Sequence, residues 1–226
     1  ALNNLLNTGM AFIQREVGRE SFKDYMNRFW FGKQTGIDLP GELSGNLNNI
    51  FGSRAVVRDI NFATASYGQG IAVTPLQMIT AFNSIVSDGQ VRKPQIVAEI
   101  RHKDGTVEQV EPEILGQAVS QETADTLQQM MVDTVETGQA KKAAVPGYYI
   151  GGKTGTAQIP SPEGGYGEDT FQSFIEFGTL ADTRFTMLIS LDSPIGSRYA
   201  DGSVVPATKE LNEFLVNYFD ISPDYN

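Results

Sequence analysis

The segment with the clearest capacity for chemistry is Gly-Gly-Lys-Thr-Gly-Thr-Ala-Gln at residues 151–158. If it forms a β-strand, Thr154 and Thr156 share one face and lie about 7 Å apart. Their two hydroxyls and the adjacent ammonium of Lys153 would then line one edge and suit a substrate carboxylate. Gly155 would let another chain approach closely, and a nearby backbone N–H could stabilise an oxyanion.

The same segment also satisfies the phosphate-loop pattern G-x-x-x-x-G-K-[ST], from Gly147 to Thr154. That interpretation, a P-loop nucleotide-binding protein, requires a helix that begins at Lys153. The residues after Lys153 are poor helix formers, and Pro160 and Pro162 would break a helix within two turns. A strand is therefore favoured, and the nucleotide-binding protein is a distant alternative.

The composition indicates a globular chain with few means of metal or redox chemistry. Its 226 residues suit one large domain or most of one. The net charge of -10 disfavours nucleic acid as a partner, because a phosphate backbone would be repelled. The sequence contains no cysteine and one histidine, His102, which leaves no cysteine-ligated or histidine-rich metal site. We therefore expect no cofactor and no metal.

Helical periodicity dominates the first part of the sequence. Apolar residues recur at helical spacing in four segments that stop at or near a glycine: 2–17, 20–30, 75–88 and 121–137. Thr74 and Ser120 stand before the last two segments as N-cap residues. Between these two helices, Asp104-Gly105 predicts a surface hairpin that joins the β-prone runs 95–101 and 106–110.

From residue 148 onward the sequence becomes β-prone. Three runs separated by short turns predict an antiparallel meander: 148–159, 171–178 and 184–191. The final segment after Pro206 predicts an amphipathic helix that covers the sheet, and its apolar residues are Leu211, Phe214, Leu215 and Tyr218. The predicted fold class is therefore α+β, with helices first, then an antiparallel sheet, then a covering C-terminal helix.

Several segments, in this order, resemble class B penicillin-binding proteins, the monofunctional peptidoglycan D,D-transpeptidases. Lys153 to Gln158 is similar to the third motif of that family, K-T-G with its usual extension. The other similar segments are Phe31-Gly32, Thr35 to Glu42, Tyr67 to Gly70, Val73 to Met78 and Ser173 to Ile175. The resemblance implies that residues 1–226 are a partial transpeptidase domain with the serine β-lactamase/transpeptidase-like fold, whose N-terminal part is missing.

The resemblance also implies a reaction. In this family a serine of an S-x-x-K motif attacks the D-Ala-D-Ala carbonyl of a stem peptide, and the acyl group then passes to a neighbouring amine. Lys153 is implied as a catalytic residue, and Thr154, Gly155 and Thr156 are implied as substrate-binding residues. No serine in this sequence is followed three positions later by lysine, so the nucleophile and its base are expected upstream of Ala1.

The second family motif, S-x-N, is expected at residues 5–7. Asn7 matches the asparagine and is implied as a catalytic residue that would hydrogen-bond the donor backbone, but Leu5 occupies the place of the serine. Because leucine relays no proton to the leaving amine, a catalytically inactive scaffold that binds wall peptide or division partners is an alternative. Ser44-Gly45-Asn46 satisfies the string, but its position matches a surface loop of the family, so we interpret it as a decoy.

The location and partners of the parent protein follow from the resemblance as well. No apolar run reaches the ~18 residues that a membrane span needs. We expect the parent protein at the extracytoplasmic face of the bacterial plasma membrane, anchored by an N-terminal span absent from this chain. The implied partners are a peptidoglycan stem peptide ending in D-Ala-D-Ala, β-lactam antibiotics and other cell-division or elongation proteins.

Overall fold

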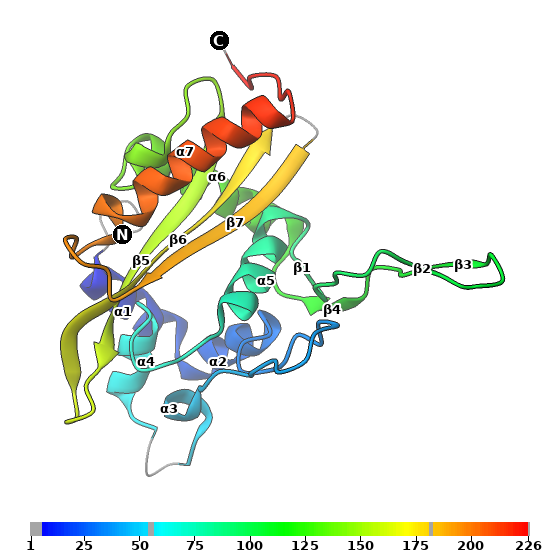
Figure 1. The fold of residues 1–226 in the computed structure, drawn as a ribbon. Helices are drawn as coiled ribbons and strands as arrows, with labels where there is room; N and C mark the ends of the chain where they lie inside the picture. The colour runs from blue at the N-terminus through cyan, green and yellow to red at the C-terminus, as the bar shows by residue number, and fades with distance from the viewer. Residues whose placement is uncertain (1–5, 54–56, 181–182, 226) are drawn as a thin grey trace.

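A computed structural model describes residues 6–53, 57–180 and 183–225 of the chain. Figure 1 shows a helical part, a three-stranded sheet that rises from it, and a last helix that lies across the sheet. A long hairpin projects sideways from the molecule. The secondary structure is thus of the predicted α+β class.

Four short helices form the helical part: α1 (Asn7–Val17), α2 (Arg19–Arg28), α3 (Asn48–Phe51) and α4 (Asp59–Ala65). Gly18 has a φ of 82°, which glycine adopts without strain, and so the chain turns directly from α1 into α2. Ile50, Phe62 and Ala65 form a small buried cluster with Phe22 packed against it. The two helices predicted near the N-terminus are confirmed over the described residues.

Two longer helices support the sheet: α5 (Pro75–Val86) and α6 (Gln121–Glu136). A capping box begins α5, because the Thr74 hydroxyl accepts the N–H of Gln77 while the Gln77 side chain accepts the N–H of Thr74. The Gln77 amide also donates to the carbonyls of Lys33 and Ser44, which ties α5 to the preceding loops. Ser120 caps α6, as predicted.

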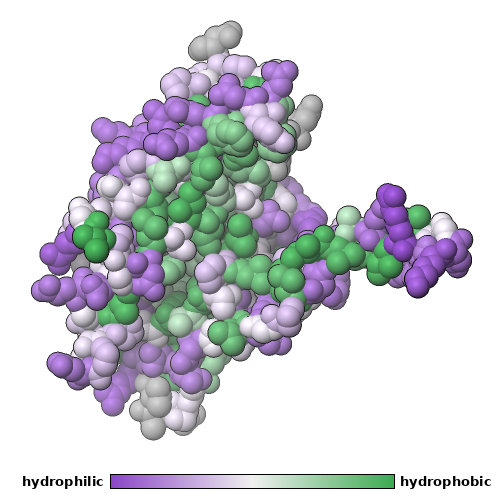
Figure 2. All heavy atoms as spheres, in the orientation of Figure 1, coloured by the Kyte–Doolittle hydropathy of each residue, from purple (hydrophilic) through white to green (hydrophobic). Residues whose placement is uncertain are grey.

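A hairpin arm, residues 90–117, connects α5 to α6. Its strands pair as two antiparallel ladders, β1 (Gln90–Arg92) with β4 (Ile114–Gln117) and β2 (Glu99–Arg101) with β3 (Val107–Gln109). The hairpin predicted around Asp104-Gly105 is confirmed, with shorter strands than expected. Figure 2 shows hydrophobic surface along the arm, on which the side chains of Ile96 and Ile114 are exposed.

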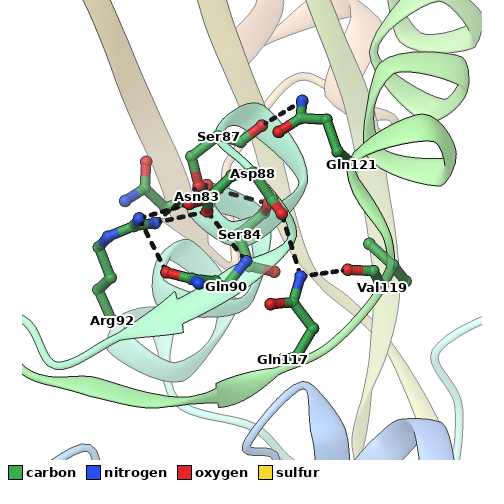
Figure 3. A network of polar contacts seen from close by, with 9 residues as sticks. All are labelled: Asn83, Ser84, Ser87, Asp88, Gln90, Arg92, Gln117, Val119 and Gln121. Carbon is green, nitrogen blue, oxygen red and sulfur yellow. Dashed lines mark hydrogen bonds and ion pairs between the residues drawn. The ribbon is translucent and has the colours of Figure 1, made fainter.

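Polar contacts tie the base of the arm to α5 and α6 (Figure 3). Arg92 donates to both carboxylate oxygens of Asp88, at 2.8 and 2.7 Å, and this pairing holds the pKa of Asp88 well below its ordinary value. Gln117 donates to the carbonyl of Asp88, and Gln121 of α6 donates to the carbonyl of Ser87. The arm is thus fixed where it leaves the body of the protein.

The antiparallel sheet has the strand order β5 (Tyr149–Pro160), β6 (Tyr166–Leu180) and β7 (Thr183–Asp192). Gly152 of β5 pairs with Glu176 of β6, which confirms the predicted pairing of these runs. β6 begins earlier than predicted, because the connecting loop occupies only 161–165 and Pro160 still pairs with Tyr166 beyond a register shift.

The sheet buries large side chains on both faces. Side chains alternate along a strand, so Phe174 and Phe177 of β6 point to opposite faces. Phe174 belongs to a buried cluster with Val204 of α7, whereas Phe177 belongs to one with Phe82 of α5 and Val132 of α6. The sheet is therefore held between α7 on one side and α5 with α6 on the other.

The C-terminal helix α7 (Val204–Tyr218) covers the sheet as predicted, but with a different face. Thr208, Asn212 and Val216, spaced four residues apart, form one row and are buried. Leu211 and Phe214, which contribute to the prediction of the helix, are 42% and 58% exposed. Hydropathy alone therefore predicted the helix but misassigned its inner face.

Candidate active-site cleft

Lys153 lies in the middle of β5, where it pairs with Ile175 of β6. The strand continues to Pro160, so no helix begins at Lys153. A phosphate loop depends on helix N-terminal amides at this point. The interpretation of the chain as a P-loop nucleotide-binding protein is therefore wrong.

The side chains of β5 alternate between two environments. Thr154 and Thr156 share a face, as predicted, but Thr154 is buried and Thr156 is exposed. The partner of Thr154 across the ladder is Phe174, which is fully buried beneath α7. Only one of the two predicted hydroxyls, that of Thr156, is thus on an exposed residue.

Thr156 lines a cleft of about 480 Å³ between the sheet and the helical part. Asn7, at the start of α1, lines the same cleft, and so do Tyr67, Gln69 and Tyr166. The fold therefore brings together two of the predicted site residues from distant parts of the sequence. Lys153, Thr154 and Gly155 are not among the described residues that line this cleft.

A hydrogen bond to the Thr156 hydroxyl determines which of its donor and acceptor positions are left for a ligand. Its oxygen accepts a hydrogen bond of 3.3 Å from the N–H of Ala200, which belongs to the short 3₁₀ helix η2 (Ala200–Gly202) before α7. A hydroxyl has one donor and two acceptor positions. Since the backbone N–H uses an acceptor position, the Thr156 O–H remains able to donate to an anion in the cleft.

Lys153 lies on the opposite face of β5 from Thr156 and is partly buried. Its ammonium donates to the carbonyl of Thr154 at 2.6 Å. Burial disfavours the charged form and lowers the pKa of Lys153 to about 8. An amine with this pKa exchanges a proton readily near neutral pH, which suits general acid–base work.

Tyr166 joins the two walls of the cleft. Its phenolic oxygen accepts a hydrogen bond of 3.1 Å from the N–H of Gly70, which follows α4. Beyond this contact, a second groove of about 530 Å³ shares Gln69, Gln158 and Tyr166 with the cleft. The cleft and the groove thus run past Tyr166 as neighbouring parts of one surface.

Comparison with known proteins shows the family to which the chain belongs. The profile of the penicillin-binding protein transpeptidase domain matches residues 1–213. The chain belongs to this transpeptidase family. It is 33% identical to stage V sporulation protein D of Bacillus subtilis, over 90% of this chain and 31% of that protein. It is 35% identical to penicillin-binding protein PbpB of Mycolicibacterium smegmatis, over 96% of this chain and 35% of that protein.

The fold also matches solved members of the transpeptidase family. The crystal structure of penicillin-binding protein 3 from Mycobacterium tuberculosis superposes with a TM-score of 0.88 and 29% sequence identity, over 98% of this chain and 51% of that chain. This match confirms the transpeptidase-like fold predicted from the sequence. The chain spans about a third of the length of the curated relatives named above.

Some predictions for this transpeptidase segment fall outside the described structure or away from the cleft. Leu5, predicted at the serine position of the S-x-N motif, lies outside the described residues. Asn46, from the string interpreted as a decoy, forms a β-bridge with Ala72 and lines the second groove, not the cleft that holds Asn7. Within residues 6–53, 57–180 and 183–225, we find no acidic or histidine cluster suited to a metal and no helix long and apolar enough to cross a membrane.

Sequence reasoning missed several residues of the transpeptidase cleft. Tyr67 and Gln69, which the sequence marks only as part of a segment similar to the family, both line the cleft. A usable signal was present, because Gly68 and Gly70 adopt positive φ values of 90° and 75° and so present Gln69 on a tight turn. Arg198 also lines the cleft and has no comparable signal in the sequence.

Proposed function

We propose that this chain is the C-terminal part of the transpeptidase domain of a class B penicillin-binding protein, a peptidoglycan D,D-transpeptidase. The observation that carries the proposal is the cleft that joins Asn7 to Thr156, beside a lysine with a lowered pKa. Relatives support it, because the Escherichia coli protein that is 28% identical is named peptidoglycan D,D-transpeptidase FtsI. The nucleophilic serine and its lysine would belong to an S-x-x-K motif in the preceding part of the parent protein.

In this proposal the reaction proceeds through a serine acyl-enzyme. The serine oxygen attacks the carbonyl of the penultimate D-alanine, the peptide bond to the terminal D-alanine breaks, and the leaving amine takes a proton. The amine of a neighbouring stem peptide then attacks the ester and releases the serine. Two proton transfers to and from serine are required, and Lys153, whose pKa is lowered to about 8, would take part in them as a catalytic residue.

The remaining predicted residues would hold the donor peptide. Asn7 would hydrogen-bond the donor backbone, and the Thr156 hydroxyl would donate to its terminal carboxylate. β5 is an edge strand among the described strands, so alternate N–H groups near Gly155 point away from the sheet and could stabilise the oxyanion. The buried Thr154 would then support the strand more than it contacts the substrate.

The same cleft would accept β-lactams in place of the donor. A solved structure of penicillin-binding protein 3 from Mycobacterium tuberculosis, at 29% identity, is described as a complex with aztreonam, and another, at 30% identity, as a complex with ampicillin. The parent protein would work at the extracytoplasmic face of the plasma membrane, held by a span outside this chain. Elongation or division proteins would be its partners.

A catalytically inactive scaffold is the second candidate, and Leu5 is the observation that favours it. The two functions separate in one assay with the full-length protein and a donor peptide that ends in D-Ala-D-Ala. A transpeptidase releases D-alanine and, with an added amine, forms the cross-linked product. A scaffold binds the donor without releasing D-alanine, and that result would overturn the proposed reaction.

A further inference from the structure

Two charged side chains line the cleft among the described residues, Glu168 from the start of β6 and Arg198 from the connection between β7 and α7. Neither forms an ion pair with another described residue. Figure 1 shows this connection beside the β5 end of the sheet, on the side where α1 begins. Arg198 is therefore a cation that is free to bind a ligand in the cleft.

Lys153, in contrast, is poorly placed to hold an anion there. Its ammonium is partly buried, donates to the Thr154 carbonyl and is not among the described residues that line the cleft. Burial also lowers the pKa of Lys153 to about 8, so part of its population is uncharged near that pH. A guanidinium keeps its charge at every physiological pH and binds a carboxylate through two parallel hydrogen bonds.

The segment that carries Arg198 is pinned on both sides. On one side, the buried Gln172 of β6 donates to the carbonyl of Ser197 at 2.8 Å and accepts the hydroxyl of Ser203. On the other side, the N–H of Ala200 donates to the Thr156 hydroxyl. Arg198 thus projects from a turn whose position is set before any ligand arrives, which lowers the entropic cost of binding.

The contact between Ala200 and Thr156 also anchors the segment that carries Arg198 at Thr156, and Arg198 and Thr156 line the same cleft. It holds the Arg198 segment against β5 at the very residue whose O–H remains free to donate. We propose that Arg198 and Thr156 together bind the terminal carboxylate of the donor, which makes Arg198 a specificity residue for carboxylate-bearing substrates. This inference rests on the proposed transpeptidase function and identifies a residue that recognises the carboxylate of the donor substrate.

Glu168 affects where in the cleft a substrate carboxylate can bind. Its carboxylate lines the same cleft and repels a second anion, so a substrate carboxylate is favoured at Arg198 and disfavoured at Glu168. A compound whose carboxylate is masked as an ester loses the attraction of Arg198 without gaining a contact at Glu168. Discrimination between acid and ester is therefore the property that Arg198 should control.

The test compares benzylpenicillin with its methyl ester on the full-length protein. The second-order rate of acylation is measured for wild type, Arg198→Ala and Arg198→Lys, with Arg101→Ala on the exposed arm as the matched loss of a cation. We expect Arg198→Ala to slow acylation by the acid roughly 10-fold to 100-fold, the effect of losing hydrogen bonds to a charged group. Acylation by the ester should change by less than about threefold, and Arg198→Lys should be intermediate.

Three results would overturn the inference. If Arg198→Ala slows acylation by the acid and by the ester equally, Arg198 supports the turn and does not bind the carboxylate. If neither rate changes in a variant that melts like wild type, Arg198 does not contact the substrate at all. If the wild-type protein is acylated by neither compound, the proposed transpeptidase function fails first, and this inference fails with it.

Discussion

Gly152 of β5 lies directly across the ladder from Glu176 of β6, and the absent side chain of the glycine makes room for a buried carboxyl. A Cβ at Gly152 would lie 2.9 Å from the Cβ of Glu176 and 2.8 Å from the carbonyl oxygen of Ile175. It would also lie 2.6 Å from the ring of Phe174. The glycine that precedes Lys153 is therefore required by packing.

We expect Gly152→Ala to destabilise the fold because backbone and ring atoms close to the new methyl group must both move. Overpacking of this kind costs about 1–3 kcal/mol. Urea unfolding measures the loss, with Gly116→Ala as the control, because a Cβ at Gly116 meets no atom within 4 Å. Equal stability of the two variants would contradict the packing argument.

Glu176 should make the stability depend on pH. Its side chain is fully buried and burial raises its pKa from 4.5 to about 8. The Asn212 amide lies near enough to offset part of this rise, but neither Glu176 oxygen has a hydrogen bond of normal geometry to a described residue. The folded protein thus keeps a proton at neutral pH that the unfolded chain releases.

The sign of the effect follows from proton counting. Between pH 4.5 and about 8, the folded state binds one more proton at Glu176 than the unfolded state, so its contribution to stability falls as the pH rises. The slope approaches about 1.36 kcal/mol per pH unit and flattens above the folded pKa. Glu176→Gln should remove this slope in urea unfolding between pH 5 and 8, whereas Glu163→Gln, in an exposed loop, should retain it. A slope unchanged by Glu176→Gln would show that the carboxyl is ionised in the fold.

Local signals predicted the elements well, because caps and glycines act within a few residues. Thr74, followed three residues later by Gln77, forms the predicted start of α5, and the β-prone run after Gly151 forms the predicted strand. The burial of Glu176 could not be predicted in the same way. Nothing next to it in the sequence indicates that Gly152 and Asn212, from two other elements, will surround it.

The candidate site was predictable only in part for the same reason. Asn7 and Thr156 carry motif signals, and the fold brings them into one cleft. Thr154 carries the same signal but is buried, because the accessibility of a strand residue depends on what covers it. Arg198 reaches the cleft through the contacts that Gln172 and Thr156 make with its turn, and these contacts are visible only in three dimensions.

Acylation should need Lys153 both for its positive charge and for its ability to exchange a proton. We expect Lys153→Ala and Lys153→Arg both to slow acylation by a β-lactam, by about 10²–10⁴-fold, because arginine keeps the charge but does not release a proton. Lys103→Ala, near the tip of the arm, is the matched control and should leave the rate unchanged. If Lys153→Arg retains the wild-type rate, the residue acts through its charge alone.

Leu5 tests the placement of the second motif. If it occupies the serine position of S-x-N, Leu5→Ser in the full-length protein should raise the acylation rate, because general acid–base help is worth about 10²–10⁴-fold. Thermal unfolding is the control, because a substitution that destabilises the fold would also change the rate. A flat rate in a folded variant would show that Leu5 belongs to another register.

Labelling with a fluorescent penicillin, followed by mass spectrometry of the labelled peptide, tests the central claim most directly. It is performed on the full-length protein and, separately, on the 226-residue chain. We predict one penicilloyl adduct on the full-length protein, on a serine that is followed three residues later by lysine and precedes this chain, and no adduct on the chain alone. An adduct on a serine within these 226 residues, or a folded full-length protein that takes no label, would contradict the account.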